Sequence, residues 1–312
     1  DCLDDAIGAL EGLLNQDPRH LEAKVYLAGL LQRVSNFPRA LHLLDEILEA
    51  QPEHLGALFL AGLVRLQDDQ PGEAIEFFER AAAMAPDSAD VTLNLVSAYR
   101  NAKRLDKALT VARRAVESSP DHVPTLNALG SVLLDLKQRN EAADIFRQAT
   151  TMDPGFHDAH INLALALLAE QHPKEAVKIL EQAVILGVPP EAVFRIFGIA
   201  YFDLGKLKES ESNLRRAIHH DPKDSQALYT LMSVLEMCGR KLDAHPIATA
   251  LIAQDPGLVH AHVVQAVTEK TEAASLAAIG RAFALAPNNI QVNMVAGTLN
   301  DMAYHPADAL RH

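Results

Sequence analysis

Apolar residues recur at helical spacing in paired segments along the whole chain. Between residues 55 and 88, one apolar helical face fills the first half and a second face fills the other half. The first face contains Leu58, Ala61, Gly62 and Leu66, and the second contains Ala74, Phe77, Phe78, Ala81 and Met84. Residues 68–72 between them predict a turn, with Pro71 at the start of the second helix. Pro86 ends that helix, because proline lacks an N–H and disfavours helical backbone in the residue before it.

This helix–turn–helix pattern returns along the chain at a constant spacing. The terminating prolines are separated by one or two periods, at Pro18, Pro52, Pro86, Pro120, Pro154, Pro222 and Pro256. A series of small residues runs in phase with them, at Ala6, Ala40, Ala74, Ala108, Ala142, Ala176, Ser210 and Ala244. A fixed period of about 34 residues is typical of a solenoid built from stacked helix pairs. We therefore predict an all-α solenoid.

Small residues also recur inside the predicted first helix of each pair. They occupy one position, at Ala28, Gly62, Gly130, Ala164, Gly198 and Gly297. A side chain no larger than a methyl group lets two helices pack closely. A bulky residue there would overpack the interface at a cost of ~1–3 kcal/mol.

The combination of these small residues with the alanine and proline series resembles the tetratricopeptide repeat (TPR). Leu129-Gly130 and Phe197-Gly198 are similar to its characteristic dipeptides, and the resemblance covers essentially the whole chain. It implies a right-handed superhelix of antiparallel helix pairs whose concave groove is lined mainly by first helices. The chain departs from the family where an aromatic residue is often found early in the first helix, because Leu58, Thr92 and His160 stand there.

In this register, residues 1–312 form a single solenoid. Residues 1–20 are a lone second helix, residues 21–258 are seven regular repeats, residues 259–289 are a shortened repeat, and residues 290–312 are a partial repeat. Met294 and Leu299 have the pattern of an internal helix, so we expect further repeats or another domain beyond the sequence given. Self-association through the terminal helices is a further expectation.

The period is interrupted twice. Val188 replaces a terminating proline, and we interpret Gly187 as a helix cap and Pro190 as the start of the next helix. From Pro256 to Pro287 the spacing is shorter than one period, so residues 268–275 leave no room for the usual turn. A tolerated deletion and a boundary between two arms are both compatible with this change.

Composition narrows the function. The net charge is −13, which disfavours binding to nucleic acid. The acidity serves either solubility or the attraction of a basic partner. No apolar run reaches the length of a membrane span, so we expect no direct membrane insertion. The Ala-rich, Lys-poor composition favours a soluble bacterial chain, whereas the compartment itself cannot be read from the sequence.

No catalytic or metal-binding constellation stands out. The chain has no P-loop, no G-x-S-x-G, no H-E-x-x-H and no C-x-x-C motif. The histidine groups are pairs rather than sets of three or four ligands, and we interpret them as solvated: His157 and His160, His219 and His220, His260 and His262. We predict no cofactor, no metal site and no enzymatic activity.

The resemblance implies that fixed positions of each repeat face the groove and bind a protein or peptide segment. These positions are Phe59, Leu60, Leu63, Leu66, Asn94, Arg100, Asn101, Asn127, Ser131, Ile161, Asn162, Leu165, Leu168, Arg195, Ile199, Phe202 and Tyr229. Asparagine amides can bind a peptide backbone, and Arg195 can meet a carboxylate of the partner. The alternative for the apolar members is packing of helix on helix.

Two specialised sites of this family are not supported. The clamp for acidic chaperone tails needs lysine and asparagine at positions that hold Val25, Gly29, Leu60 and Asp90 here. The asparagine ladder of the O-linked N-acetylglucosamine transferases is broken: Asn94 and Asn162 match it, whereas Tyr26, Leu60, Ala128 and Ile196 do not.

The sequence therefore predicts a non-catalytic protein-interaction scaffold. The alternative is a substrate-recruiting arm of a larger transferase or hydroxylase whose catalytic domain lies outside this sequence.

Overall fold

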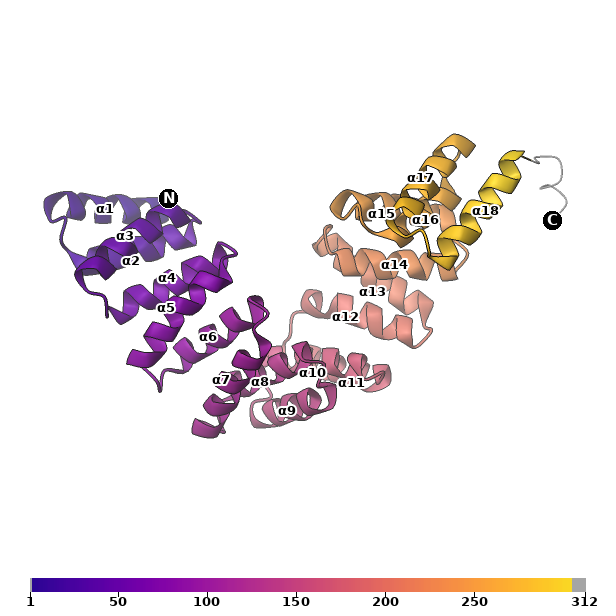
Figure 1. Cartoon of the computed structure of the whole chain (residues 1–312). Helices are drawn as coiled ribbons and strands as arrows, with labels where there is room; N and C mark the ends of the chain where they lie inside the picture. The colour runs from indigo at the N-terminus through magenta and orange to yellow at the C-terminus, as the bar shows by residue number, and fades with distance from the viewer. Residues whose placement is uncertain (1, 305–312) are drawn as a thin grey trace. The chain divides into compact units, whose positions relative to one another are not determined.

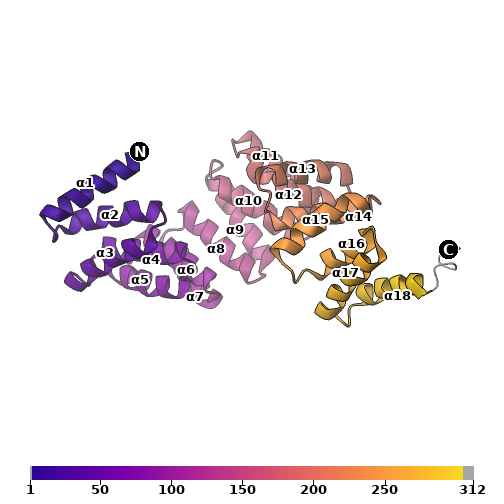
Figure 2. The ribbon, with the colours of Figure 1, turned by 90° about the horizontal axis from the view of Figure 1, so that it is seen from above.

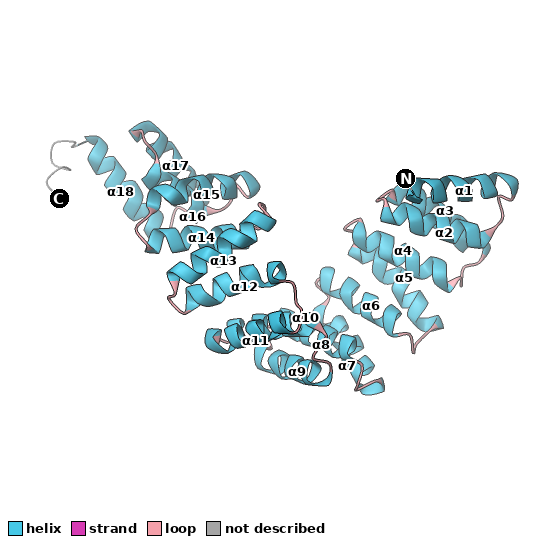
Figure 3. Ribbon diagram, turned by 180° about the vertical axis from the view of Figure 1, so that it is seen from behind, coloured by secondary structure: helices cyan, strands magenta, loops and turns pink. Residues whose placement is uncertain are grey.

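The computed structural model describes residues 2–304, which form helices joined by short loops, without a strand (Figures 1 and 3). The first helices of the pairs are α2 (Leu21–Arg33), α4 (Leu55–Gln67), α6 (Ala89–Asn101), α8 (Val123–Asp135), α10 (His157–Ala169), α12 (Pro190–Asp203), α14 (Ser225–Met237), α16 (Val259–Thr268) and α18 (Ile290–Tyr304). The second helices are α1 (Cys2–Gln16), α3 (Phe37–Ala50), α5 (Pro71–Met84), α7 (Leu105–Ser118), α9 (Arg139–Met152), α11 (Pro173–Ile185), α13 (Leu207–His220), α15 (Lys241–Gln254) and α17 (Glu272–Leu285).

The chain divides into two compact units, Asp1–Ala166 (unit 1) and Leu167–His312 (unit 2). Within each unit, a helix packs against the next helix in the chain, as Figure 2 shows for α4 and α5. First helices of neighbouring repeats also touch, so α2, α4, α6 and α8 form one layer in unit 1. This is the all-α solenoid architecture predicted from the constant spacing of the repeats. That the two units form a single solenoid stays a prediction, and so does the end of the partial repeat, since residues 305–312 lie outside the described residues.

A left-handed residue turns the chain from the first helix into the second. These residues follow the period of the repeat, at Ser35, Asp69, Lys103, Lys137, Gln171, Gly205 and Gly239, with φ between 55° and 72°. At the turn that contains Asp69, the N–H of Gln70 donates a hydrogen bond to the carbonyl of Arg65 at 2.8 Å, and this bond closes the end of α4. Backbone hydrogen bonds therefore hold this turn even where the left-handed residue is not glycine. The sequence pattern does not predict the left-handed conformation at those positions.

Polar side chains cap the first helices at the same period. Nδ1 of His54 accepts a hydrogen bond from the N–H of Ala57 at 3.1 Å. His20 makes the same bond one repeat earlier, and Ser88 makes it one repeat later. A neutral imidazole can therefore replace the usual serine at the cap, because its ring nitrogen offers the same lone pair.

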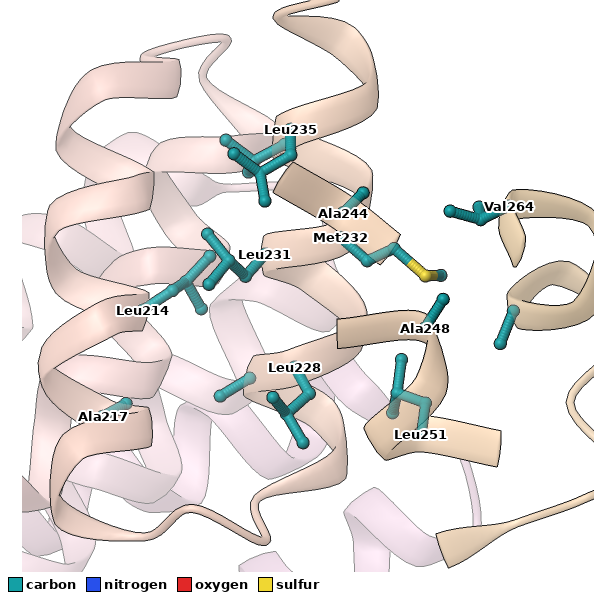
Figure 4. Packing of buried hydrophobic residues seen from close by; sticks show 13 residues of the cluster. Leu214, Ala217, Leu228, Leu231, Met232, Leu235, Ala244, Ala248, Leu251 and Val264 are labelled. Carbon is teal, nitrogen blue, oxygen red and sulfur yellow. The ribbon is translucent and has the colours of Figure 1, made fainter. Parts of the chain in front are cut away.

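The small residue of the first helix receives one large side chain from the second. A methyl group at Gly62 would lie 2.6 Å from Cζ of the buried Phe78, and Gly130 has the same relation to Phe146. In unit 2 the corresponding residue is a leucine, because Leu214 occupies this place against Gly198. Figure 4 shows Leu214 and its neighbours of the unit 2 core, where α13, α14 and α15 meet. The predicted close approach of the two helices is confirmed in these repeats.

The shortened repeat corrects one expectation. The turn between α16 and α17 spans 269–271 and is as long as the turn between α4 and α5. The deletion is taken from α16, which has 10 residues where α4 has 13. Glu269 is extended (φ −65°, ψ 147°) instead of helical, and Thr271 caps α17. There is therefore room for a three-residue connection, contrary to the prediction, but the left-handed turn of the seven regular repeats is absent, because Glu269 is extended.

The other interruption agrees with its interpretation. α11 ends at Ile185, Gly187 adopts a positive φ of 100°, and α12 begins at Pro190. Gly187 therefore takes the conformation of a C-terminal cap, and Pro190 stands where its missing N–H costs nothing.

Two histidines that were expected to be solvated are buried. The exposed fraction is 5% for His160 and 2% for His262. Nε2 of each donates to the carbonyl of the proline that ends the preceding helix, at 3.0 Å to Pro154 and 2.9 Å to Pro256. The solvated interpretation is wrong for both, because they occupy the helix position that Leu58 fills with an apolar side chain.

Candidate protein-interaction surface

In unit 1 the layer of first helices presents an apolar face beside a polar one. Successive residues of an α-helix are rotated by about 100°, so Leu63 lies on the side of α4 opposite the buried Ala61. Leu60 lies at the edge of that side and also packs against the core of unit 1. Of the predicted groove residues, unit 1 contains Phe59, Leu60, Leu63, Leu66, Asn94, Arg100, Asn101, Asn127, Ser131, Ile161, Asn162 and Leu165. The outward face of α6 is polar, since it carries Asn94, Ser97 and Asn101. Half-buried apolar groove residues therefore lie on α4 and again on α10, where they are Ile161 and Leu165, with the polar face of α6 between them.

Tyr26 belongs to the apolar face, although the sequence singled it out only as a mismatch to the asparagine ladder. Its exposed fraction is 69%, and it lies one turn before Gly29 on the outward side of α2. Cδ2 of Leu60 is 3.8 Å from the position that a Cβ atom at Gly29 would occupy, so α2 and α4 are in contact there. We call Tyr26, Leu60 and Leu63 the apolar face of unit 1. In the sequence, Tyr26 can be recognised as an aromatic residue at a helix position outside the pattern of buried apolar residues.

Not every predicted groove residue lies on this outward side. The ring of Phe59 meets the ring of the buried Phe78 edge-on at 5.9 Å between centroids. In unit 2, Phe202 packs against the hydrophobic core and Leu168 is buried. Phe59, Phe202 and Leu168 therefore contact neighbouring helices.

Two asparagines of successive repeats are hydrogen-bonded to each other. Nδ2 of Asn162 donates to Oδ1 of Asn127 at 2.9 Å. The hydroxyl of Ser131 donates to the backbone carbonyl of Asn127 at 2.9 Å. Among the described residues, no further hydrogen bond is made by the NH₂ group of Asn127 or by the side-chain carbonyl of Asn162. The pair therefore offers the NH₂ group of Asn127 as a donor and the side-chain carbonyl of Asn162 as an acceptor, which are the groups that a peptide backbone needs.

The two predicted groove arginines are bonded within the chain. Nε of Arg100 lies 2.7 Å from Oδ2 of Asp135, which joins α6 to α8. Nε of Arg195 lies 3.1 Å from Oδ2 of Asp224, and this carboxylate also caps α14. Both arginines therefore connect first helices of successive repeats, and a partner carboxylate would have to compete with that bond.

Arg195 also borders a hollow of unit 2. The hollow has a volume of about 410 Å³ and is lined by Pro189, Glu191, Ala192, Arg195, Ala217, His220, Asp221 and Asp224. Its polar groups carry both signs of charge, so its chemistry does not select one ligand.

The remaining predicted residues of unit 2 are Tyr229 and Ile199. The ring of Tyr229 is 5.8 Å from the ring of His260, whereas Ile199 is half-buried on α12. Nε2 of His260 donates to Oε2 of Glu236 at 2.8 Å. This hydrogen bond, against the opposing effect of burial, raises the pKa of His260, and a further bond to Gln291 acts in the same direction.

A tyrosine beneath the polar face also has a shifted pKa. Tyr99 of α6 donates its hydroxyl to Glu79 of α5. Burial, together with this bond to a carboxylate, raises the pKa of Tyr99 to about 12. The phenol therefore stays protonated at neutral pH and acts as a tie between α5 and α6 rather than as an acid or base.

Within residues 2–304, no cluster of three or more histidine, cysteine, aspartate or glutamate side chains could hold a metal ion. None of the described helices is long and apolar enough to cross a membrane.

Two family models match the chain. The model of the cilia and flagella-associated protein 70 C-terminal domain, a TPR domain, matches residues 54–269, more than two thirds of the chain. The model of the anaphase-promoting complex (cyclosome) subunit 3 matches residues 2–81. No curated protein matches the chain.

Solved structures show the same fold at low sequence identity. The APC/C hetero-tetramer Cut9–Hcn1 has a TM-score of 0.66 at 14% identity, covering 96% of this chain and 59% of that one. PilW, a type IV pilus biogenesis factor, has a TM-score of 0.59 at 18% identity, with 66% of this chain and 97% of that chain covered. A tetratricopeptide repeat protein from Parabacteroides merdae has 0.57 at 14% identity, with 79% and 98% covered. This chain thus spans 59% of the length of the APC/C chain that it resembles.

Proposed function

The chain belongs to the family of tetratricopeptide repeat proteins represented by the cilia and flagella-associated protein 70 C-terminal domain, and we propose that it binds a protein segment on its layer of first helices. In this role it is a non-catalytic scaffold. Neither matched family description names a catalytic activity. The similarity to the APC/C structure, whose chains are parts of an assembly, is in keeping with a protein-interaction role.

One observation carries the proposal: the first helices of unit 1 present an apolar face on α2 and α4 and, on α8 and α10, an amide pair with unused hydrogen-bonding groups. Tyr26 is 69% exposed, and Leu60 and Leu63 of the same face are half-buried. Apolar side chains that remain partly accessible together on one surface are typical of sites of protein interaction. The Asn127–Asn162 pair offers a donor and an acceptor in fixed positions. A protein segment can satisfy both, because its side chains are apolar at intervals and its backbone carries one N–H and one C=O per residue.

The test is affinity capture from a cell extract, with every captured protein quantified by mass spectrometry. The variant Asn127→Ala with Asn162→Ala removes both partners of one hydrogen bond, so no polar group is left unpaired. The control is Asn140→Ala with Gln148→Ala, which removes two exposed amides from α9. We expect the first variant to lose captured proteins that the control retains. Equal capture by both variants contradicts the proposal.

Self-association is a second candidate, and α18 favours it. Ile290 and Met294 of this helix have exposed fractions of 78% and 68%. Two large apolar side chains on one helix can pair with another copy of the chain. Light scattering over a series of protein concentrations tests this candidate, and a constant monomer mass excludes it.

The alternative of a substrate-recruiting arm uses the same surface. An arm of a transferase or hydroxylase would bind its substrate protein where a scaffold binds its partner. The sequence of the intact reading frame separates the two, because only the arm is joined to a catalytic domain.

A further inference from the structure

Building on the proposed function, we infer that the apolar face of unit 1 binds a basic amphipathic protein segment, one whose apolar side chains are flanked by lysine or arginine. Tyr26 on α2, together with Leu60 and Leu63 on α4, supplies the apolar contact. The charge of the partner follows from the carboxylates around this face.

The segment 1–100 is strongly acidic. It contains 17 aspartates and glutamates against 7 lysines and arginines, so ten of the thirteen net negative charges of the chain lie there. The segment 101–312 is nearly balanced. A partner that approaches the apolar face therefore meets a negative field that the rest of the chain does not produce.

Most basic side chains of this region are already occupied. Lys24 is paired with Glu46, Arg39 with Glu11, Arg65 with Glu73 and Arg100 with Asp135, while Arg80 donates to the carbonyl of Pro52. Of the seven lysines and arginines in residues 1–100, only Arg19 and Arg33 make no ion pair or side-chain hydrogen bond within the described residues. The region thus has few internal cations left to neutralise its carboxylates.

Three loops, those before α4, after α4 and before α6, carry four carboxylates without an ion-pair partner. They are Glu53 in the loop before α4, Asp68 and Asp69 in the turn after it, and Asp87 in the loop before α6. No ion pair joins these four carboxylates to any lysine, arginine or histidine of the described part of the chain. No lysine or arginine lies in those loops. An apolar centre with an acidic margin selects a ligand with the complementary pattern.

Nucleic acid and acidic protein tails do not have this pattern, since both are anionic. A second copy of the chain would bring the same excess of negative charge to the contact. The occupant favoured by these observations is therefore a cationic segment of another protein.

The probe is a fluorescein-labelled 14-residue helical peptide of leucine and lysine, titrated against the full chain by fluorescence anisotropy. Two control peptides keep the same length, one with glutamate in place of lysine and one with serine in place of leucine. We expect the leucine–lysine peptide to bind and both controls to bind at least about tenfold more weakly. Binding that is equal for the glutamate peptide overturns the inference.

Variants of the chain separate this face from general attraction to an acidic protein. Tyr26→Ser with Leu63→Ser removes apolar contacts at exposed and half-buried positions, and we expect affinity to fall about tenfold or more. The matched control Ile185→Ser changes an 83% exposed residue of unit 2 and leaves affinity unchanged. Circular dichroism checks that both variants keep the helicity of the parent.

The charge is tested in the same titration. Asp68→Asn with Asp69→Asn removes two carboxylates beside the face, and asparagine tolerates the left-handed conformation of Asp69. Asp45→Asn with Glu49→Gln removes the same charge from α3. We expect the first pair to weaken binding about threefold to tenfold at low salt and to flatten its salt dependence, and the second pair to change affinity less than about twofold. Equal losses in both pairs show attraction to net charge alone and overturn the inference.

The inference and the proposed function fail in different ways. If the asparagine double variant loses its captured proteins while Tyr26→Ser with Leu63→Ser retains them all, the scaffold function stands and the basic partner is wrong. If neither variant loses any captured protein, the proposed function fails as well.

Discussion

The same contact between the first and the second helix is filled differently in two repeats, the repeat of α4 and α5 and the shortened repeat of α16 and α17. The first pairs a glycine with a phenylalanine, because Gly62 leaves room for the ring of Phe78. The second has Ala266 and Ile279 at the corresponding positions of its core, where both are buried. A larger residue on one helix is thus matched by a smaller one on the other. The comparison shows that the repeat preserves the volume of this contact, whereas the length of the first helix can change.

The two repeats also differ in how the chain turns between their helices. Asp69 is left-handed with φ 55°, and α4 keeps 13 residues. Glu269 is extended, and α16 keeps 10 residues. The loss of about one helical turn therefore changes the backbone conformation that the connection requires.

The largest effect is expected from removing the large side chain of the contact. Phe78→Ala should cost ~3–5 kcal/mol of local stability, because the buried ring leaves a cavity between the two helices. Ile279→Ala removes a smaller side chain and should cost less, ~2–3 kcal/mol. Native-state hydrogen exchange of the peptides from each helix pair measures both losses. A loss at Ile279 equal to that at Phe78 would show that the contact differs in more than volume.

Replacing a glycine by alanine should change stability in opposite directions in the two repeats. Gly62→Ala places a methyl group 2.6 Å from a buried ring, and this overpacking of ~1–3 kcal/mol should outweigh the gain of ~1 kcal/mol in helix propensity. Gly280 of α17 has no atom within 4 Å of the new methyl group. Gly280→Ala should therefore stabilise its helix by up to ~1 kcal/mol. Melting temperatures of the two variants should shift in opposite directions, and a shift in the same direction rejects the close contact.

The caps are expected to contribute less. His54→Ala removes the acceptor for the N–H of Ala57 and should cost ~1 kcal/mol in exchange protection of α4. His54→Ser should retain the protection, since Ser88 makes the equivalent bond in the next repeat. Thr271→Ala should cost a similar amount in α17, where Thr271 accepts from the N–H of Ala274. If serine fails to replace His54, the imidazole stabilises the helix by something other than capping.

Glycine should have opposite effects in the two turns. Asp69→Gly relieves a left-handed conformation and should stabilise the α4–α5 repeat by ~0.5–1 kcal/mol. Glu269→Gly should destabilise the shortened repeat by ~0.5–1 kcal/mol, because its φ of −65° needs no glycine and the unfolded chain gains freedom. Thermal unfolding of both variants at one pH is a sufficient measurement. Stabilisation by both substitutions contradicts the backbone difference.

The smallest expected effect is a dependence of the stability of the shortened repeat on pH. The raised pKa of His260 means that its bond with Glu236 stabilises the fold fully below the unfolded histidine pKa of ~6.5. This stabilisation is lost as the pH rises through the higher folded value. Exchange protection of α16, corrected for the intrinsic pH dependence, should therefore decrease between pH 6 and pH 9. Glu236→Gln should remove that decrease, and a pH dependence that survives the substitution assigns it to another group.

The sequence by itself determined the period, the helix pairs and the residues that start and end them. Pro71, Pro86 and Gly62 act on their own helix or on its neighbour in the chain, so the pattern of a single repeat contains their effect. The pattern of buried positions likewise reveals the inward face of each helix, because burial has the period of the helix itself.

Only the tertiary structure decided which side chains meet between repeats. The bonds of Arg100 to Asp135 and of Asn162 to Asn127 join successive repeats, and their formation depends on the rotation and offset of neighbouring helices. The burial of His160 and the exposure of Tyr26 depend on the same offset. Periodicity gives each helix its inward side, but the contact between two helices also depends on their relative height and angle, which the sequence of either helix does not contain.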